Sequence, residues 1–497
     1  MLLRITLIIA ALMIPSSTVA RAQTAAPSGA TIAWTSDDPT LAEIKRICIG
    51  GGFPSKELVA KLDERSDDLE VQRAREEMKE VLRRMRQEYG LTPQQLLEKV
   101  KGRIPDVTAN DLERWREAGQ LQHRMIDGQV AYFRREPSNL LRFCDEAKQR
   151  CGQEASTGQK FVLTDHLAKV IEEAQRTGRA EVTPVRHRIQ YKVTVPANPA
   201  RAKKGSLLRV WLPFPQECRQ QSEVKLISAA PADPRITANG VKDGRILANA
   251  QRTAYFEKRL DDPAKSNTFE ITFEYVSHAY YPTLTDEDAR PLPADFDKAW
   301  LAERAPHILF TPELKQAVAK VVGDETNPLA RARKIFHHVD SKIRYCAEEE
   351  YCLIPSFSTK ALSSQKGDCG IQSILFITMC RAAGIPARWQ SGWETKPSGW
   401  NMHDWTEFYV EPWGWLPADP SYGLQKSDRA DVREFYFGHQ DSYRLVVNLD
   451  YGSPLVPAKQ SLRSEPADFQ RGEVELDGRN LYFDEWGYDI QFEWEQR

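Results

Sequence analysis

The spacing of apolar residues changes along this chain and divides the sequence into regions of different secondary structure. Between Leu58 and Tyr89, apolar residues recur at mainly helical spacing, with dense charges of both signs between them. From 181 to 290 they alternate with polar residues, as in Phe269-Glu270-Ile271-Thr272-Phe273, which is typical of strands with one buried face. From 291 to 440 the sequence predicts helices followed by short strands. Together these patterns predict an α+β fold.

Residues 23–180 are predicted to be mainly helical. Asp38-Pro39 supplies a cap and a first-turn proline for one helix, and Thr92-Pro93-Gln94-Gln95 is a capping box that begins another. Farther along, two short apolar segments joined at Asp127-Gly128 predict a β-hairpin. The segment Gln23–Trp34 is small and polar and is expected to be disordered. This region is expected to be a helical arm that packs on the later domains.

Residues 181–290 are predicted to form an antiparallel β-sandwich-like domain, because turn-rich stretches separate their alternating strands. Residues 441–497 form a predicted C-terminal β-rich extension, with strands at Tyr443–Leu449 and Glu473–Trp494. The pattern leaves open whether these strands extend the sheet of the preceding region or return to the β-sandwich. At 497 residues the chain is too long for one core, and we expect about two to four domains.

Residues 291–440 contain the candidate chemistry. Two helices with proline at the first position begin after Thr311 and Asn327. The run from Ile371 to Met379 has no polar face, so it predicts a buried helix that begins at Cys369. His403 precedes an alternating strand, and Asp419 follows a shorter apolar strand.

These positions predict a nucleophilic cysteine. Cys369 lies at a helix N-terminus, where the helix dipole favours the thiolate, and Gly367 and Gly370 permit a tight turn around it. His403 and Asp419 on neighbouring strands fit an imidazole that a carboxylate orients beside the thiol. A lone cysteine in a buried helix is more often structural, as we expect for Cys380. Three such residues in one ordered pattern favour catalysis.

At these residues the chain resembles the transglutaminase-like superfamily of papain-type cysteine enzymes, in a bacterial exported multidomain form. The resemblance implies a papain-like core in which Cys369 is the nucleophile, His403 the general base and acid, and Asp419 the orienting carboxylate. It also implies a thioester acyl-enzyme and no cofactor. The matching motifs run in order between 310 and 425: Gly367-Asp368-Cys369-Gly370, Gly384-Ile385-Pro386-Ala387-Arg388, His403-Asp404-Trp405, Gly414-Trp415 and Asp419-Pro420.

The acyl acceptor separates the functional alternatives. Water would make the enzyme a peptidase or amidase, whereas an amine would make it a protein-glutamine gamma-glutamyltransferase that crosslinks proteins. The short segment between Trp393 and His403 predicts an open rim and favours hydrolysis. In that segment Trp400 is expected to lie in a loop and to form a wall of the cleft. The backbone N–H of Cys369 and the side chain of Gln365 are candidate oxyanion donors. A non-catalytic binding or scaffold protein on the same fold is the third alternative.

The N-terminus predicts export. Arg4, the apolar run Ile5–Ile14 and Ala20-Arg21-Ala22 together fit a signal peptide over residues 1–22 that is cleaved before Gln23. The protein is therefore expected to be secreted or periplasmic, with no integral membrane segment in the mature chain. In an oxidising compartment, the pairs Cys144/Cys151 and Cys346/Cys352 are candidate disulfides.

The net charge and the spacing of possible metal ligands limit the binding partners that the sequence predicts. The formal net charge of −2 gives no attraction to nucleic acid, so the helix and hairpin near Asp127 are not expected to form a DNA-binding winged helix. No zinc or calcium site is expected, because there is no CxxC pair, His337 and His338 are adjacent, and no calcium-ligand loop is present. Asp286-Glu287-Asp288 is expected to be an exposed linker. The expected partner is a peptide or protein substrate, including cell-wall peptide.

Overall fold

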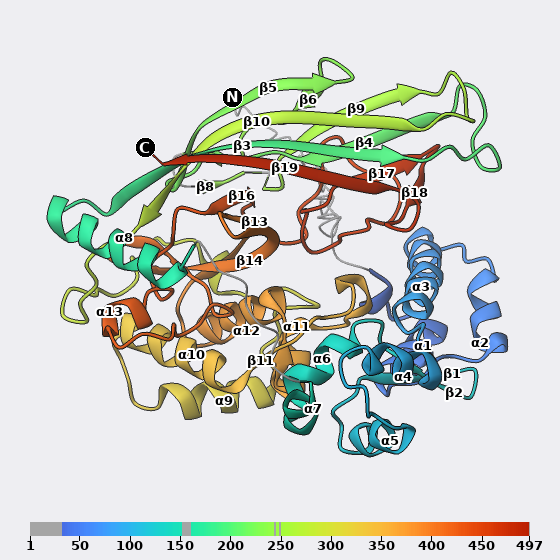
Figure 1. Ribbon diagram of the computed structural model, residues 1–497, viewed down its shortest axis with the longest axis horizontal. Coiled ribbons are helices and arrows are strands. Elements are labelled where there is room, and N and C mark those ends of the chain that lie inside the picture. Colours follow the sequence, from blue (N-terminus) through green and yellow to red (C-terminus); the bar gives the residue numbers. More distant parts are fainter. Residues whose placement is uncertain (1–31, 152–160, 243–244, 248–249, 497) are drawn as a thin grey trace, which may run out of the picture.

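The computed structural model describes residues 32–151, 161–242, 245–247 and 250–496. The expected signal peptide lies outside these residues. A β-sandwich lies along the top of the molecule in Figure 1, a mixed helical and strand region lies beneath it, and α1–α5 form a separate lobe at the lower right. The predicted α+β fold is confirmed.

The N-terminal lobe forms largely through local capping interactions. The Asp38 side chain accepts the N–H of Leu41, and Thr92 forms both hydrogen bonds of its predicted capping box. The hairpin turns at Asp127 and Gly128, whose φ angles are 50° and 77°. The elements are α1 (Pro39–Ile49), α2 (Lys56–Ala60), α3 (Leu69–Glu88), α4 (Pro93–Lys101), α5 (Ala109–Glu117), β1 (His123–Ile126), β2 (Gln129–Tyr132), α6 (Glu136–Phe143), α7 (Asp145–Arg150) and α8 (Leu163–Thr177).

The structure refines two expectations for this lobe. The helical spacing between Leu58 and Tyr89 is interrupted between α2 and α3, where Asp68 caps a new helix by accepting the N–H groups of Glu70 and Val71. The expected disorder of Gln23–Trp34 fails at its end, because Trp34 is buried and its Nε1 donates to the backbone oxygen of Cys352 at 2.8 Å. A partner 318 residues away in the sequence therefore holds Trp34, whereas residues 23–31 lie outside the described part of the chain.

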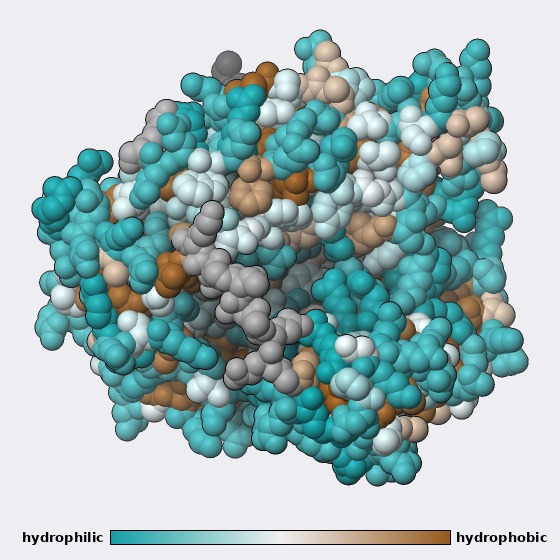
Figure 2. Space-filling model, in the orientation of Figure 1, coloured by the Kyte–Doolittle hydropathy of each residue, from teal (hydrophilic) through white to brown (hydrophobic). Residues whose placement is uncertain are grey.

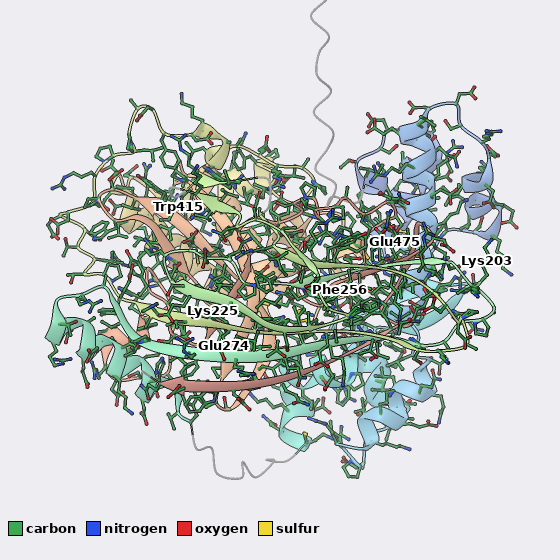
Figure 3. The ribbon with its side chains drawn as sticks, turned by 90° about the horizontal axis from the view of Figure 1, so that it is seen from above. Lys203, Lys225, Phe256, Glu274, Trp415 and Glu475 are labelled. Atoms are coloured by element: carbon green, nitrogen blue, oxygen red, sulfur yellow. The ribbon has the colours of Figure 1, made fainter. Side chains whose placement is uncertain are left out.

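The predicted β-sandwich is built from two antiparallel sheets, with the strand orders β19-β3-β10-β5 and β18-β17-β4-β9-β6. Lys225 of β5 and Glu274 of β10 are paired in register on neighbouring strands of the first sheet (Figure 3). The strands are β3 (Glu181–Val195), β4 (Leu207–Pro213), β5 (Gln221–Ala230), β6 (Arg235–Ile236), β9 (Thr253–Arg259), β10 (Asn267–Tyr280), β17 (Glu473–Leu476), β18 (Arg479–Leu481) and β19 (Gly487–Gln496), with a small ribbon of β7 (Val241–Lys242) and β8 (Arg245–Ile246).

The C-terminal strands divide between the two β structures, which answers the question that the sequence left open. β16 (Arg444–Asn448) pairs with β13 and extends the sheet of the region beneath the sandwich. β17 pairs with β4, and β19 pairs with β3, so both return to the sandwich. The end of the chain therefore links the two regions.

The region beneath the sandwich has a four-stranded antiparallel sheet in the order β15-β14-β13-β16, with helices packed on it. Every residue from Cys369 to Arg381 in α12 is buried, as the unbroken apolar run predicted. The elements are α9 (Pro312–Val322), α10 (Pro328–Lys342), β11 (Arg344–Tyr345), α11 (Phe357–Ser364), β12 (Lys366–Gly367), α12 (Cys369–Ala382), β13 (Ala387–Lys396), β14 (Gly399–Val410), β15 (Gly414–Ala418) and α13 (Ala430–Arg433).

The predicted disulfides are absent, because all eight cysteines are free thiols. Cys144 and Cys151 cap opposite ends of α7, which separates them by about 10 Å along the helix axis. A disulfide requires Cα atoms within about 7 Å. Cys346 and Cys352 contact different partners: the sulfur of Cys346 is 3.2 Å from Glu348, and that of Cys352 is 3.3 Å from Arg84.

The surface in Figure 2 is hydrophilic over most of the face shown, with scattered hydrophobic side chains. In the described part of the chain, none of the helices is long and apolar enough to cross a membrane.

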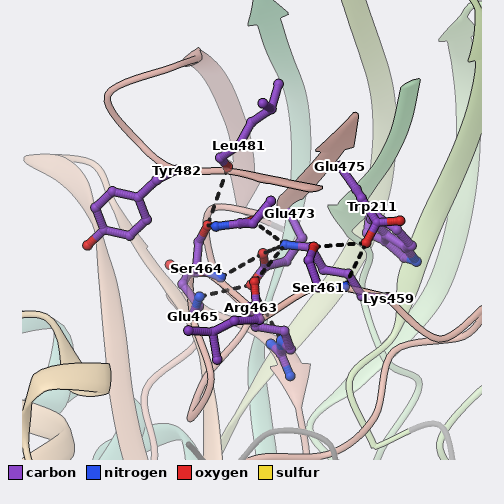
Figure 4. A network of polar contacts seen from close by, with 12 residues as sticks. Trp211, Lys459, Ser461, Arg463, Ser464, Glu465, Glu473, Glu475, Leu481 and Tyr482 are labelled. Carbon is purple, nitrogen blue, oxygen red and sulfur yellow. Dashed lines mark hydrogen bonds and ion pairs between the residues drawn. The ribbon is translucent and has the colours of Figure 1, made fainter. Parts of the chain in front are cut away.

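A buried ionic network fixes the segment before β17 (Figure 4). Glu473 is fully buried and accepts from Lys459 Nζ at 2.6 Å and from the backbone N–H of Ser464 at 2.8 Å. Arg463 Nε lies 3.4 Å from the other carboxylate oxygen of Glu473. Burial opposes ionisation, but the charges of Lys459 and Arg463 outweigh it and lower the pKa of Glu473 to about 2.

We expect Glu473→Gln to lower the free energy of unfolding by about 3–5 kcal/mol, because it leaves two buried cations without their counter-charge. The carboxylate contributes stability above its unfolded pKa near 4.5, and this contribution is lost as the pH falls toward 2. The difference between the two proteins should therefore shrink in acid. Urea unfolding at neutral and acidic pH measures this difference. Glu493→Gln, on the exposed strand β19, is the control and should cost less than about 0.5 kcal/mol.

Candidate active site

The first residue of α12 is the candidate nucleophile. Asp368 caps the helix by accepting the N–H of Ile371 at 3.1 Å, which leaves Cys369 on the first turn. Gly370 has no positive φ, so it does not serve the tight turn predicted from its conformational freedom. A Cβ at this position would overlap the hydroxyl group of Tyr351, so the glycine is required for close packing next to the thiol.

His403 and Asp419 form the pair that the sequence predicted. His403 Nε2 lies 2.6 Å from Asp419 Oδ2 across β14 and the end of β15, and both residues are buried. The same carboxylate oxygen accepts from Arg444 Nη1 at 2.7 Å. Burial alone would raise the pKa of Asp419, but the charges of His403 and Arg444 hold it well below its ordinary value. Asp419 is therefore held as an anion in contact with the imidazole of His403.

The thiol of Cys369 contacts Asp404 instead of His403. Its Sγ lies 3.4 Å from Asp404 Oδ2, and no hydrogen bond joins Cys369 to His403 among the described residues. Successive side chains of a strand point to opposite faces. Asp404 and Phe408 point toward α12, where Phe408 meets Phe376 at a ring distance of 6.0 Å. The structure thus brings together His403 and Asp419, and it places the thiol of Cys369 beside Asp404, the sequence neighbour of His403.

The carboxyl group of Asp368 and the hydroxyl group of Tyr351 also lie near the thiol. The hydroxyl of Tyr351 lies 3.0 Å from Asp368 and 3.1 Å from Asp404, although it has only one proton to donate. Burial and the nearby charge of Glu348 raise the pKa of Asp368 to about 7. Burial and Asp368 raise the pKa of Asp404 well above its ordinary value.

The charge on Cys369 differs from the expectation. Burial, followed by the charges of Asp404 and Asp368, raises the pKa of the Cys369 thiol well above its ordinary value. The helix dipole favours a thiolate by only about 0.3–1 kcal/mol at exposed sites, and here it is outweighed. These surroundings favour the neutral thiol of Cys369 over its thiolate.

A cavity of about 250 Å³ opens beside Cys369. Its walls come from the segment before α11, from β14 and from the segment before β17. Tyr351, Met402 and Gln470 are among the lining residues, whereas His403 is not. The acidic side chains that line it are Glu348, Glu349, Glu350, Asp368, Asp404, Glu465 and Asp468, and the basic ones are Arg135 and Arg471.

The sequence did not predict the acidic lining of the cavity. Only Asp404 gave a local signal, because it is an acidic residue directly after the candidate histidine His403. Two other candidates lie elsewhere. Gln365 is exposed at the end of α11 and does not line the cavity. Trp400 belongs to β14, because Lys396 pairs directly with Gly399 in a tight hairpin where a loop was expected. Its ring lies 6.1 Å from Trp393 and 6.4 Å from Tyr488.

Comparison with known proteins confirms the resemblance. Residues 315–420 match the model of the transglutaminase-like superfamily. An uncharacterized protein of Haemophilus influenzae is 26% identical over 182 residues, which cover 29% of this chain and 48% of that protein. The chain thus spans about half the length of this curated relative.

Two solved structures match part of this chain at low identity. One is a protein from Cytophaga hutchinsonii provisionally named a cysteine protease, at 13% identity, with 64% of this chain and 92% of that chain covered and a TM-score of 0.42. The other is the periplasmic domain of TgpA from Pseudomonas aeruginosa, at 15% identity, with 54% and 94% covered and a TM-score of 0.24.

The raised pKa of Cys369 predicts how the thiol is alkylated. We expect iodoacetamide to modify Cys369 slowly at neutral pH and faster as the pH rises, because only the thiolate reacts. Asp404→Asn removes the carboxylate whose charge raises the pKa of Cys369. It should speed alkylation by about tenfold at alkaline pH, where Asp404 is ionised, and this factor corresponds to one pKa unit. Peptide mapping by mass spectrometry follows Cys369 separately from Cys151.

Asp37→Asn is the matched control, because Asp37 is exposed and outside the cavity lining, and its rate should equal that of the unchanged protein. Rapid alkylation of Cys369 at neutral pH in the unchanged protein would contradict a neutral thiol.

Proposed function

Because residues 315–420 of this chain are a transglutaminase-like core, we propose that the protein is a cysteine enzyme that hydrolyses amide bonds of peptides or proteins through a thioester. One observation carries the proposal: Cys369 lies on the first turn of a buried helix, at the wall of a cavity of about 250 Å³. The His403–Asp419 pair lies on adjacent strands of the sheet against which that helix packs.

The proposed reaction has two steps. The sulfur of Cys369 bonds to the amide carbonyl carbon, and the amine leaves with a proton to give a thioester. Water then attacks the same carbon, and the carboxylic acid leaves as the thiol re-forms. Backbone N–H groups on the first turn of α12 have no partner within the helix, so that of Cys369 is placed to donate to the oxyanion.

Proton transfer is assigned to two side chains. In the resting structure the thiol proton points to Asp404 Oδ2, so Asp404 is its first acceptor. His403, held by Asp419, is assigned the transfer to the leaving amine and from the attacking water. This assignment requires His403 to approach the thiol when substrate binds, since hydrogen bonds in catalytic sites often tighten only in the complex.

Hydrolysis is proposed over transfer to an amine because the segment between β13 and β14 is a tight hairpin, which adds no lid over the site. Protein-glutamine gamma-glutamyl transfer uses the same residues and differs only in the acceptor. Export to the periplasm or the medium, where peptides and cell-wall material are the accessible substrates, is part of the proposal and rests on the N-terminal sequence.

We expect Cys369→Ala to abolish amide hydrolysis and His403→Ala to lower kcat/KM by about 10²–10⁴-fold, the range of a general acid or base. Asp419→Asn should lower it less, because the imidazole remains but loses its orienting anion. Release of new amino groups from a set of peptide, protein-glutamine and cell-wall peptide substrates measures the activity. Cys151→Ala, at a half-buried cysteine outside the cavity lining, is the control and should retain full activity.

A labelled primary amine added to the same assays identifies the acceptor. Incorporation of the amine that outpaces hydrolysis would assign the enzyme to crosslinking and leave Cys369 in its role. Turnover by the Cys369→Ala variant, or the absence of turnover on every substrate together with an inert thiol, would overturn the proposal in favour of a binding protein.

A further inference from the structure

The cavity beside Cys369 is lined by more acidic side chains than the protein pairs with cations. Four of its seven acidic side chains have cationic partners. Lys360 pairs with Glu348 and Glu349, and Arg471 pairs with Glu350 and Glu465 at 2.8 and 2.6 Å. The remaining three are Asp368, Asp404 and Asp468, and none of them forms an ion pair with a described residue.

Asp468 is the most exceptional of the three. The residue is only 6% exposed. Asp368 and Asp404 receive hydrogen bonds from Tyr351, whereas the carboxyl group of Asp468 receives none from any described residue. It borders the cavity. A buried carboxyl group without a partner is costly, and such groups are normally satisfied by a hydrogen bond or a cation.

We propose that this cavity is a subsite for a primary ammonium group of the substrate, which Asp468 and Asp404 bind beside the thiol of Cys369. The proposal deepens the proposed function, on which it rests, by naming the substrate class: amides that carry a lysine-like side chain or a free amino group close to the scissile bond. An ammonium has three donors and a single positive charge, so it can satisfy several carboxylates at once.

The geometry favours an organic cation over a metal ion. No group of three or more His, Cys, Asp or Glu among the described residues is arranged to hold a metal. Gln470 Nε2, a donor, occupies Asp404 Oδ1 at 2.7 Å, whereas Oδ2 lies beside the Cys369 thiol and the Tyr351 hydroxyl. The volume of about 250 Å³ accommodates a side chain as well as its ammonium group.

The bound cation also has a consequence for the nucleophile. The charges of Asp404 and Asp368 raise the pKa of Cys369, and a cation placed among them offsets this effect. A cationic substrate would therefore make the thiolate more accessible in the complex than in the free enzyme. The same group would then confer both recognition and activation.

Binding is tested with the full chain carrying Cys369→Ala, so that no turnover is needed. Isothermal titration compares three probes of similar size: Nα-acetyl-lysine amide, norleucine amide with a free α-amino group, and Nα-acetyl-norleucine amide, which is neutral. We expect at least one cationic probe to bind tenfold or more tightly than the neutral one, because a hydrogen bond to a charged group is strong enough to change the affinity by this factor. The tighter of the two cationic probes distinguishes a side-chain ammonium from an α-ammonium.

Adding Asp468→Asn should remove most of this preference, whereas adding Asp37→Asn, at an exposed carboxylate, should leave it unchanged. Equal binding of all three probes would overturn the proposal, and so would calcium chloride binding at the site while neither amine binds. Since the comparison of probes needs no second variant, misfolding of Asp468→Asn would not obscure the result.

The two proposals fail separately. Selective amine binding with no hydrolysis by the unchanged enzyme would leave the subsite and remove the proposed activity. Hydrolysis of peptides with equal kcat/KM, whether a lysine, a free α-amino group or neither lies next to the scissile bond, would leave the proposed activity and remove the subsite.

Discussion

The position of Cys369 depends on the packing of α12. This helix is apolar on every side, and it lies between α10, where Phe336 and Phe376 are 6.3 Å apart, and β14, where Phe376 meets Phe408. A helix buried on all faces cannot rotate or slide without opening voids, each of which costs contact energy. Because its first turn reaches the edge of this packed layer, the thiol lies at a fixed point on the wall of the cavity.

The N-terminal lobe and the C-terminal segments both build that wall. The segment between β11 and α11 lines the cavity and has little secondary structure of its own. Trp34 and Arg84 hold it from the N-terminal lobe through Cys352, and Tyr89 donates to Glu349 at 3.1 Å. Arg471 lies two residues before Glu473 of the buried ionic network and forms an ion pair with Glu350. The C-terminal segment therefore also holds the segment between β11 and α11. The N-terminal lobe and the C-terminal segment therefore help to shape the cavity beside Cys369.

Burial sets the electrostatics of this site. Carboxyl groups removed from water either find cations or take up protons, and both outcomes occur within one cavity. The pairs with Lys360 and Arg471 keep part of the lining ionised, while the pKa of Asp468 is raised well above its ordinary value by burial, by Glu465 and by Asp404. Strongly shifted carboxyl groups beside a cysteine are typical of a functional site more than of a structural core.

The sequence by itself determined the local structure and the identity of the candidate residues. The capping box at Thr92, the hairpin at Asp127-Gly128 and the buried helix after Cys369 all depend on residues within a few positions of one another, and all were predictable. The pairing of His403 with Asp419 followed from two adjacent strands. The motifs around these residues also indicated the superfamily whose model matches residues 315–420.

Only the tertiary structure decided which groups face the thiol. Period-two alternation separates His403 from Asp404, but it does not reveal which of the two faces α12, because that depends on how the sheet packs. The charge of Cys369 depends on carboxyl groups brought together from three separate segments, and the anchoring of those segments uses contacts such as Tyr89 to Glu349, 260 residues apart. Contacts of this range leave no periodic or local pattern, so the acidic cavity became visible only in the folded chain.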